Sequence, residues 1–276
     1  MKKDRFVKIW IWVGLIFLFI FVLFPFYWMF VTSIKPDSEI LSSQPTLWPQ
    51  KIIFKHYQKA WVYGKIGKYF KNSIIIASMT VVLSLLAVVP AAYASIIYRS
   101  QVMNIISSFI LFLQMFPGIL LLIPLYILMK NYQLIDTYTA LVISYSTFTI
   151  PFCYLLTKSY FEGIPRELFE AARIDGCSDN GIFVKIALPL ILPGIMVIGL
   201  FSFVLAWCDF MFANTFSNSE ATRTITVGVS TLQGVWTVEW GPLMAAASIA
   251  TIPILIIFSF ANKYIIEGLT AGAVKG

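Results

Sequence analysis

Side chains that could carry out catalysis are scarce in this chain. Its 276 residues include one histidine, His56, and three cysteines, Cys153, Cys177 and Cys208. A Ser–His hydrolase or a zinc enzyme needs histidine beside a nucleophile or beside further metal ligands. No cysteine pair has metal-ligand spacing, and an odd number implies no disulfide framework. We therefore expect His56 at the surface of a polar loop, and we predict no catalytic residue, metal ligand or cofactor in this chain.

Sequence signals for binding nucleotides or nucleic acids are missing as well. No GxxxxGK[ST] loop occurs, so the chain does not bind a nucleotide through a P-loop. The formal net charge is +7, but basic residues do not alternate with stacking aromatics. That charge suits contact with anionic lipid and does not indicate nucleic acid.

The apolar runs contain hydroxyl and amide side chains but no Asp, Glu, Lys or Arg at their centres. Ion-coupled and proton-coupled transporters usually keep ionisable groups there, so a secondary transporter is disfavoured. The neutral polar groups either bond between helices or line a pathway for an uncharged, polyhydroxylated solute. The pathway alternative selects Gln114, Ser144, Tyr145, Thr147 and Phe148, and the two aromatic rings among them suit stacking on a sugar.

Residues 158–185 form a charged segment between two apolar runs, with four basic and five acidic residues among 28. Pro165 favours the first turn of a helix and Gly176 favours its C′ position. The 11 residues from Pro165 to Asp175 give about 16 Å of helix. Glu170 lies four residues after Arg166 and three before Arg173, so ion pairs can brace the exposed side.

One face of this predicted helix has small side chains, so another helix or backbone can approach closely. That face contains Leu168, Ala171, Ala172 and Asp175. Ser178 is placed to cap a second helix, which bends into the next span at Pro189. A solvated connector would explain the charges. It would not explain why Pro165 and Gly176 mark the two ends of the helix, or why one face has small side chains.

The elements that position these residues are membrane spans. The chain is 59% hydrophobic and 12% charged, against about 25% charged in soluble domains, and a span needs about 20 apolar residues. The sequence predicts an all-α polytopic membrane protein with a single transmembrane domain over residues 1–276. The six predicted spans are 9–31, 73–98, 104–129, 138–157, 186–208 and 241–262, and the shorter run at 224–238 is predicted to be interfacial or re-entrant.

The N-terminal tail indicates the orientation. It carries four basic residues against one acid within the first eight, which favours a cytoplasmic N-terminus. Six spans then return the C-terminus to the cytoplasm, and the lysine-rich loop at 32–71 becomes external and mostly extended. Because seven lysines lie in that loop, the inverted topology is the alternative on charge alone.

Several motifs resemble one family of membrane proteins. Glu170-Ala171-Ala172, three residues, Gly176, nine residues, Ile186, one residue and Leu188-Pro189 match the EAA loop of ABC importer permeases. The ending YIIEGLTAGAVKG and the segments LAWCDFMFANTF and WGPLMAAASIATIPILIIFSFANKY resemble the carbohydrate, maltose-permease-like branch. The likeness covers essentially the whole chain. Cys208-Asp209 departs from it, since sugar permeases often show an Asn-Glu pair after the Trp.

The resemblance implies a partnership in a bacterial or archaeal cytoplasmic membrane. Such a permease pairs with a second, homologous permease, two ABC ATPases that bind ATP and magnesium, and an external solute-binding protein that delivers sugar. The EAA helix between the fourth and fifth spans would couple to the ATPase through Glu170, Ala171, Ala172, Gly176, Ile186, Leu188 and Pro189. The glycine-rich tail from Gly268 to Gly276 would reach toward the same interface.

Three alternatives remain at this point. The same machine could import a polyol or a glycerol phosphate. A secondary transporter or channel would work without partner subunits, and flux through the reconstituted chain alone would favour it. A membrane-embedded enzyme would need a catalytic constellation, and the sequence shows none.

Overall fold

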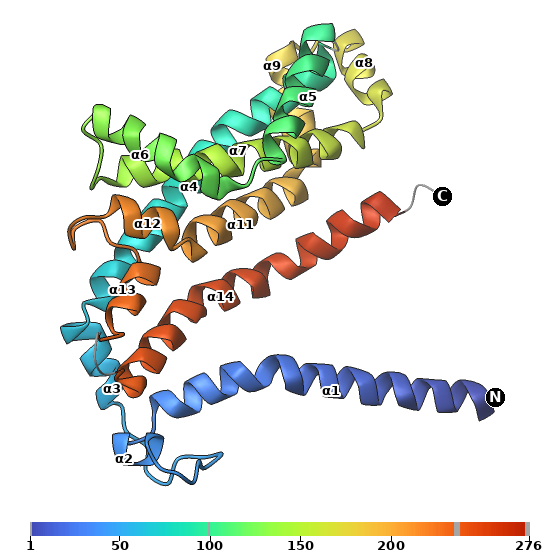
Figure 1. The fold of residues 1–276 in the computed structure, drawn as a ribbon. Helices are drawn as coiled ribbons and strands as arrows, with labels where there is room; N and C mark the ends of the chain where they lie inside the picture. Colours follow the sequence, from blue (N-terminus) through green and yellow to red (C-terminus); the bar gives the residue numbers. More distant parts are fainter. Residues whose placement is uncertain (1, 99, 235–237, 274–276) are drawn as a thin grey trace. The chain divides into compact units, whose positions relative to one another are not determined.

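The long apolar runs form helices, because a backbone in hydrocarbon must satisfy its hydrogen bonds within its own segment. The computed structural model describes residues 2–98, 100–234 and 238–273 (Figure 1). Their regular structure is helical, apart from one isolated antiparallel bridge between Gln233 and Val238. The helices are α1 (Lys2–Ser33), α2 (Asp37–Ile40), α3 (Lys55–Gln58), η1 (Lys59–Tyr63), α4 (Ile66–Ile97), α5 (Gln101–Gln114), η2 (Gly118–Leu121), α6 (Leu122–Asn131), α7 (Tyr138–Glu162), α8 (Arg166–Ile174), α9 (Asp179–Ile182), η3 (Phe183–Ala187), α10 (Leu188–Leu190), α11 (Leu192–Cys208), α12 (Met211–Phe216), α13 (Ile225–Thr231) and α14 (Trp240–Ala273).

Four stretches of the described residues are helical, long and apolar enough to cross a membrane: Val7–Ser33, Ile66–Ile97, Tyr138–Glu162 and Trp240–Phe260. Two bent helix pairs raise this number to six when each pair counts as one span. The all-α membrane fold is therefore confirmed. The run predicted to be interfacial or re-entrant contains only the short helix α13 among its described residues.

The third and fifth predicted spans each contain a sharp bend between two helices. In the third, Gln101–Gln114 meets Gly118–Asn131 at 97°. Pro117 precedes η2 there, and proline has no N–H to continue the preceding helix. In the fifth, Asp179–Leu190 meets Leu192–Cys208 at 74°, and Ile191 is the residue between them.

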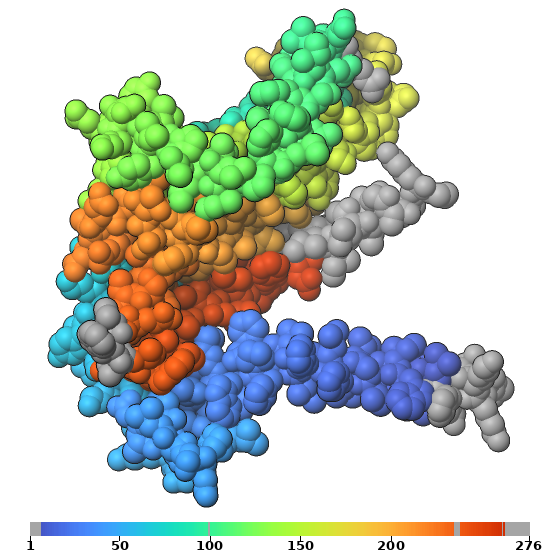
Figure 2. Space-filling view, viewed as in Figure 1, coloured from blue at the N-terminus to red at the C-terminus, as the bar shows by residue number. Residues whose placement is uncertain are grey.

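The chain divides into two compact units, Met1–Lys68 with Gly228–Ile252 and Tyr69–Val227 with Pro253–Gly276. In the second unit, α7 packs mainly against α11 and α5. In Figure 1, α8 and α9 lie at the same end of α7 as α5, whereas α6 and α12 lie at the other end. Figure 2 shows the surface of α6, in green, adjoining the orange surface of α12.

Glycine sets how closely two helices of this unit approach. A Cβ added at Gly194 of α11 would lie 2.7 Å from Cγ of Tyr160 in α7, so only glycine fits against that ring without movement. Hydroxyl groups join the same bundle: Ser84 of α4 bonds Thr149 of α7 at 2.8 Å, and Ser202 of α11 lies 3.4 Å from the Cys153 sulfur. For these polar residues the alternative of bonding between helices is confirmed.

The first loop differs from expectation, because it contains α2, α3 and η1 where we predicted a mostly extended chain. His56, expected at the surface, is 2% exposed, and its Nε2 lies 2.8 Å from the Lys35 carbonyl oxygen. A Cβ added at Gly241 would overlap the His56 ring. The start of α14 therefore packs directly onto the imidazole. Gly241 and His56 are 185 positions apart in sequence, so no local sequence pattern predicts this contact.

The glycine-rich tail is helical through Ala273, because α14 continues to that residue. Residues 274–276 lie outside the described part of the chain. The proposed reach of this tail toward a partner therefore stays a prediction.

Candidate functional site

The charged loop forms the helix that Pro165 and Gly176 predict. Pro165 is the N-cap residue of α8, and Asp175 is its C-cap. Gly176 follows with φ +83°, and its N–H donates to the Arg173 carbonyl at 3.0 Å. The Cys177 N–H donates to the Ala172 carbonyl at 2.9 Å, which completes a Schellman motif. The helix therefore has a fixed start and a fixed end.

The inner side of α8 is held by an aromatic cluster. Phe169 is 4% exposed, and its ring meets Tyr93 of α4 edge-on at 6.2 Å between centroids. Tyr93 also contacts Phe161 of α7 at 5.6 Å and Phe183 of η3 at 4.8 Å. Buried aromatic pairs of this kind stabilise beyond their area, by about 0.5–1.5 kcal/mol each. The cluster attaches α8 to three other elements of the same unit.

Burial of Phe169 rotates α8 away from the predicted orientation. Ala172 is 6% exposed and lies in the hydrophobic core beside Phe169, whereas Leu168, Ala171 and Asp175 are exposed. The predicted small face is therefore divided between the inside and the outside. Ala172 cannot itself receive a partner, because its side chain already packs within this chain.

The outward stripe of α8 consists of Glu167, Glu170, Ala171 and Ile174, which are all exposed at helical spacing. Ile174 is 87% exposed, a large apolar side chain on an otherwise charged helix. We did not single it out from sequence, although its position four residues after Glu170 was a usable signal. The stripe offers two carboxylates, one small residue and one apolar residue to a partner.

The link from α8 to the next span is short and braced. Arg173 Nη2 pairs with Asp179 Oδ1 of α9 at 3.0 Å. Within the described residues it is this carboxylate, and not Glu170, that pairs with Arg173. Ser178 caps α9 as predicted, because its Oγ accepts the Gly181 N–H at 3.2 Å.

The rest of the link leads directly into the 74° bend. The π-helical turn η3 follows α9, and Ile186 and Leu188 pack against the core while Pro189 is exposed. Pro189 has no N–H for the carbonyl four residues earlier, and a widened turn accommodates its ring. The structure thus places all seven predicted coupling residues on one continuous path from α8 to α11. Their role in coupling stays a prediction.

The predicted pathway residues on α7 are partly engaged inside the fold. Ser144 is fully buried, and its hydroxyl donates to the Ala140 carbonyl at 2.7 Å. The Tyr145 hydroxyl donates to Asp209 Oδ1 at 3.0 Å. Thr147 donates to the Ser144 carbonyl at 2.6 Å. These hydroxyls are satisfied without a solute.

Of the other two predicted pathway residues, Gln114 lies on α5 and Phe148 on α7. Gln114 is exposed at the end of α5. Phe148 packs on Phe212 of α12 at 5.0 Å between centroids, and a Cβ added at Gly118 would lie 2.9 Å from its ring. Phe148 therefore sits at the bend of the third span. The structure does not gather the five residues into one site, and their role in a pathway stays a prediction.

Asp209, the departure from the sugar-permease pattern, has a structural task. Its Oδ1 accepts the N–H groups of Phe212 and Ala213, both at 3.1 Å, and so caps the start of α12. Burial raises the pKa of its carboxyl, although the hydrogen bonds from Ala213, Tyr145 and Phe212 act in the opposite direction.

A second polar cluster fixes the segment that follows α12, and we did not predict it. Asn72 of α4 donates to the carbonyls of Ala221 and Arg223 at 3.0 and 2.8 Å, and it accepts from the Tyr138 hydroxyl at 2.6 Å. Asp136 accepts from the Ser219 N–H at 3.0 Å and from the Thr222 hydroxyl. This turn-rich segment is therefore held by the buried Asn72 and the half-buried Asp136, which both lie far from it in sequence.

Comparison with known proteins finds relatives over the whole chain. Residues 84–270 match the model of a family described as "Binding-protein-dependent transport system inner membrane component". The chain is 37% identical over 279 residues to the trehalose/maltose transport system permease protein of Thermococcus litoralis, covering 100% of each chain. It is 32% identical over 276 residues to the diacetylchitobiose uptake system permease protein of Streptomyces coelicolor, again covering 100% of each.

A solved structure shares the fold over nearly the full length. One chain of a bacterial ABC transporter involved in import of the acidic polysaccharide alginate superposes with a TM-score of 0.85 at 24% identity. The match covers 96% of this chain and 98% of that one.

Among the described residues, no group of three or more His, Cys, Asp or Glu side chains is arranged to hold a metal ion.

Proposed function

The chain belongs to the binding-protein-dependent transport system inner membrane component family, and on that premise we propose that it imports a sugar or oligosaccharide as the permease subunit of an ATP-driven transporter. The observation that carries the proposal is full-length similarity to permeases named for trehalose/maltose and diacetylchitobiose uptake. The absence of ionisable groups at the centres of the apolar runs supports an uncharged cargo and an external source of energy.

The charged loop supports coupling to a separate ATPase. In this proposal the outward stripe of α8 sits against an ATPase subunit, with Glu170 in polar contact and Ala171 and Ile174 in close packing. Closure of the ATPase moves α8 as a rigid body, because Gly176 and the Tyr93 cluster fix it to the unit. The Arg173–Asp179 pair and the bent link carry the displacement into α11, and the pathway alternates its access.

The proposed assembly contains further partners. The most apolar 18-residue window within the span Val7–Ser33 has no residue buried inside the chain, so this part of α1 has surface for lipid or for a second permease. The family description itself names a binding protein. We infer a heterodimer of permeases with two ATPase subunits, both termini of this chain being cytoplasmic.

Reconstitution tests the proposal directly. Proteoliposomes containing this chain, its partner permease, the ATPases and the binding protein should import labelled maltose, trehalose or diacetylchitobiose only with internal ATP. This chain reconstituted alone should show no flux. Flux through the chain alone would indicate a channel or secondary transporter, and import of glycerol 3-phosphate in place of every sugar would assign the other cargo.

A further inference from the structure

Two cavities adjoin each other in the unit formed by Met1–Lys68 and Gly228–Ile252. The first encloses about 260 Å³ between the end of α1, the helix α2 and the start of α14. The second encloses about 200 Å³ and extends from α2 to α3. Both are lined by Ile40, Leu41 and Trp240, so this tryptophan stands between them. The two cavities are called the paired cavities below.

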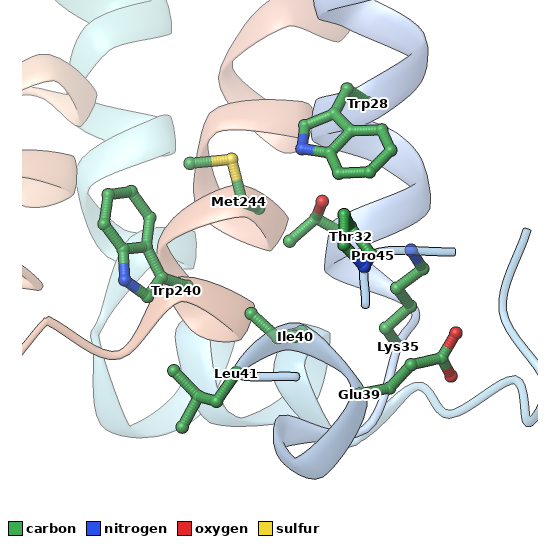
Figure 3. A pocket seen from close by; sticks show the side chains of 9 residues that line it. All are labelled: Trp28, Thr32, Lys35, Glu39, Ile40, Leu41, Pro45, Trp240 and Met244. Atoms are coloured by element: carbon green, nitrogen blue, oxygen red, sulfur yellow. The ribbon is translucent and has the colours of Figure 1, made fainter. Parts of the chain in front are cut away.

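The first cavity combines aromatic surface with polar groups. Figure 3 shows Trp28 on α1 and Trp240 on α14, with Thr32 and Met244 between them. Lys35 is 2% exposed, and its Nζ lies 4.8 Å from the centroid of the Trp28 ring and donates to the Thr46 carbonyl. Glu39 accepts from the Thr46 hydroxyl and from the Gln50 N–H at 3.2 Å. The polar groups are therefore held in place before any ligand arrives.

The second cavity has the same character. Lys59 of η1 pairs with Glu239 at 2.6 Å, and both line the cavity with Asp37 and Lys55. The buried His56 ring forms part of its wall and lies 3.7 Å from Asp37. Trp240 presents apolar ring surface among these groups.

Charge balance narrows the class of ligand. The first cavity has one base, Lys35, and one acid, Glu39. The second has two bases, Lys55 and Lys59, and two acids, Asp37 and Glu239. The formal charges of the lysines and carboxylates cancel in each cavity, so neither cavity favours a free anion such as a phosphate headgroup. Fixed donors and acceptors beside flat aromatic rings suit a ligand with many hydroxyls and apolar ring faces.

Size and division indicate how much of such a ligand fits. Pockets for drug-sized ligands have about 300–1,000 Å³, and each of these cavities is smaller. One sugar ring in each, with the linkage beside Trp240, uses both volumes. We propose that the paired cavities bind a neutral disaccharide unit, with Trp240 as the stacking platform and Glu39, Lys35 and the Lys59–Glu239 pair as partners for hydroxyls.

The site would receive cargo before it enters the membrane pathway. This placement rests on the proposed function and on a cytoplasmic N-terminus, which puts the end of α1 at the external face. The paired cavities contain none of the pathway residues predicted on α5 and α7. A neutral sugar released by a binding protein would first bind in the paired cavities. This chain would then have a sugar-binding site in addition to its membrane pathway.

Equilibrium binding to the assembled transporter tests the proposal. The complex in phosphatidylcholine nanodiscs, without binding protein, is titrated with labelled maltose, trehalose and diacetylchitobiose. At least one should bind, and Trp240→Ala should weaken it roughly tenfold, a loss of about 1.4 kcal/mol. The matched control is Trp48→Ala, because Trp48 is an exposed tryptophan in the first loop of the same unit and lines neither cavity; it should leave binding unchanged.

Further arms keep the result interpretable. Should Trp240→Ala fail to assemble, Glu39→Gln keeps the side-chain size and should weaken binding roughly two- to tenfold. Binding abolished by phosphatidylglycerol nanodiscs would show a lipid headgroup site and overturn the proposal. Equal affinity of wild type and both cavity variants, or binding of none of the three sugars, would also overturn it. ATP-driven import is measured in parallel. Import without sugar binding at the paired cavities would overturn only this proposal, whereas absence of import would count against the proposed function.

Discussion

At the residue scale, Gly176 carries a backbone requirement without a steric one. Its φ of +83° lies in the left-handed region, and a Cβ added there would meet no atom within 4 Å. A side chain at this position therefore costs free energy through backbone conformation alone, about 1 kcal/mol for alanine. This cost falls on the end of α8, the helix that we propose couples to the ATPase.

We predict that Gly176→Ala lowers the melting temperature of the purified complex by a few degrees and reduces transport-coupled ATP hydrolysis. The matched control is Gly163→Ala, because Gly163 also ends a helix but has φ −75°. Differential scanning fluorimetry and ATPase assays measure both effects. Equal melting temperatures for the two variants would show that the positive φ is not what constrains this position.

Asp209 caps the start of α12 and Asp136 bonds the segment that follows α12, and the two should differ in how much stability is lost with their charge. Burial alone raises the pKa of Asp136, but hydrogen bonds from Ser219 and Thr222 bring it below its ordinary value. Its stabilising contribution is therefore present above the unfolded pKa of about 3.9 and is lost as the pH falls through the lower, folded pKa. The pKa of Asp209 is instead raised by burial, so its ionised form is disfavoured in the folded state.

We predict that Asp136→Asn lowers the melting temperature at pH 7 more than Asp209→Asn does. The gap between wild type and Asp136→Asn should shrink as the pH falls below about 4, because the Asp136 carboxyl is protonated first in the unfolded state and only at lower pH in the folded state. Thermal melts of the complex between pH 3.5 and 7 measure this. A larger loss for Asp209→Asn at pH 7 would contradict the assignment.

At the scale of elements, α8 is a helix with an inner and an outer side that sequence alone did not separate. Its length and ends were predicted from Pro165 and Gly176, because caps act within a few residues. Its rotation was not, since it depends on Tyr93 and Phe161, which come from α4 and α7. The alanine pair Ala171-Ala172 therefore looked like one surface and is two.

This division gives a paired prediction for α8. Ala171→Trp changes an exposed position, so the protein should still assemble, but ATP hydrolysis and import should fall at least tenfold through loss of fit to the ATPase. Ala172→Trp forces a large ring into the core beside Phe169 and should prevent stable expression. Fluorescence-detected size exclusion and import assays separate the two outcomes. Normal import by Ala171→Trp would remove the outer stripe from the coupling proposal.

At the scale of the whole molecule, uncharged runs located the segments that meet hydrocarbon but not the direction of their axes. The third and fifth runs were predicted as spans, and each contains a sharp bend whose angle the sequence did not predict. Hydropathy reports the solvent of a segment, whereas the bend angles depend on Pro117, on the residues around Ile191 and on packing such as Gly194 against Tyr160. The buried position of His56 escaped prediction for the same reason, because Gly241 lies far away in sequence.

Orientation is the remaining property of the whole chain, and cysteine labelling tests it. Cys177 is exposed on the loop after α8, and cytoplasmic termini put that loop inside the cell. With Cys153 and Cys208 replaced by serine, a membrane-impermeant maleimide should label Cys177 only after the cells are permeabilised. In a cysteine-free chain carrying Ser43→Cys, on the exposed part of the first loop, labelling should occur in intact cells. The reverse pattern would establish the inverted topology, and the paired cavities would then open to the cytoplasm.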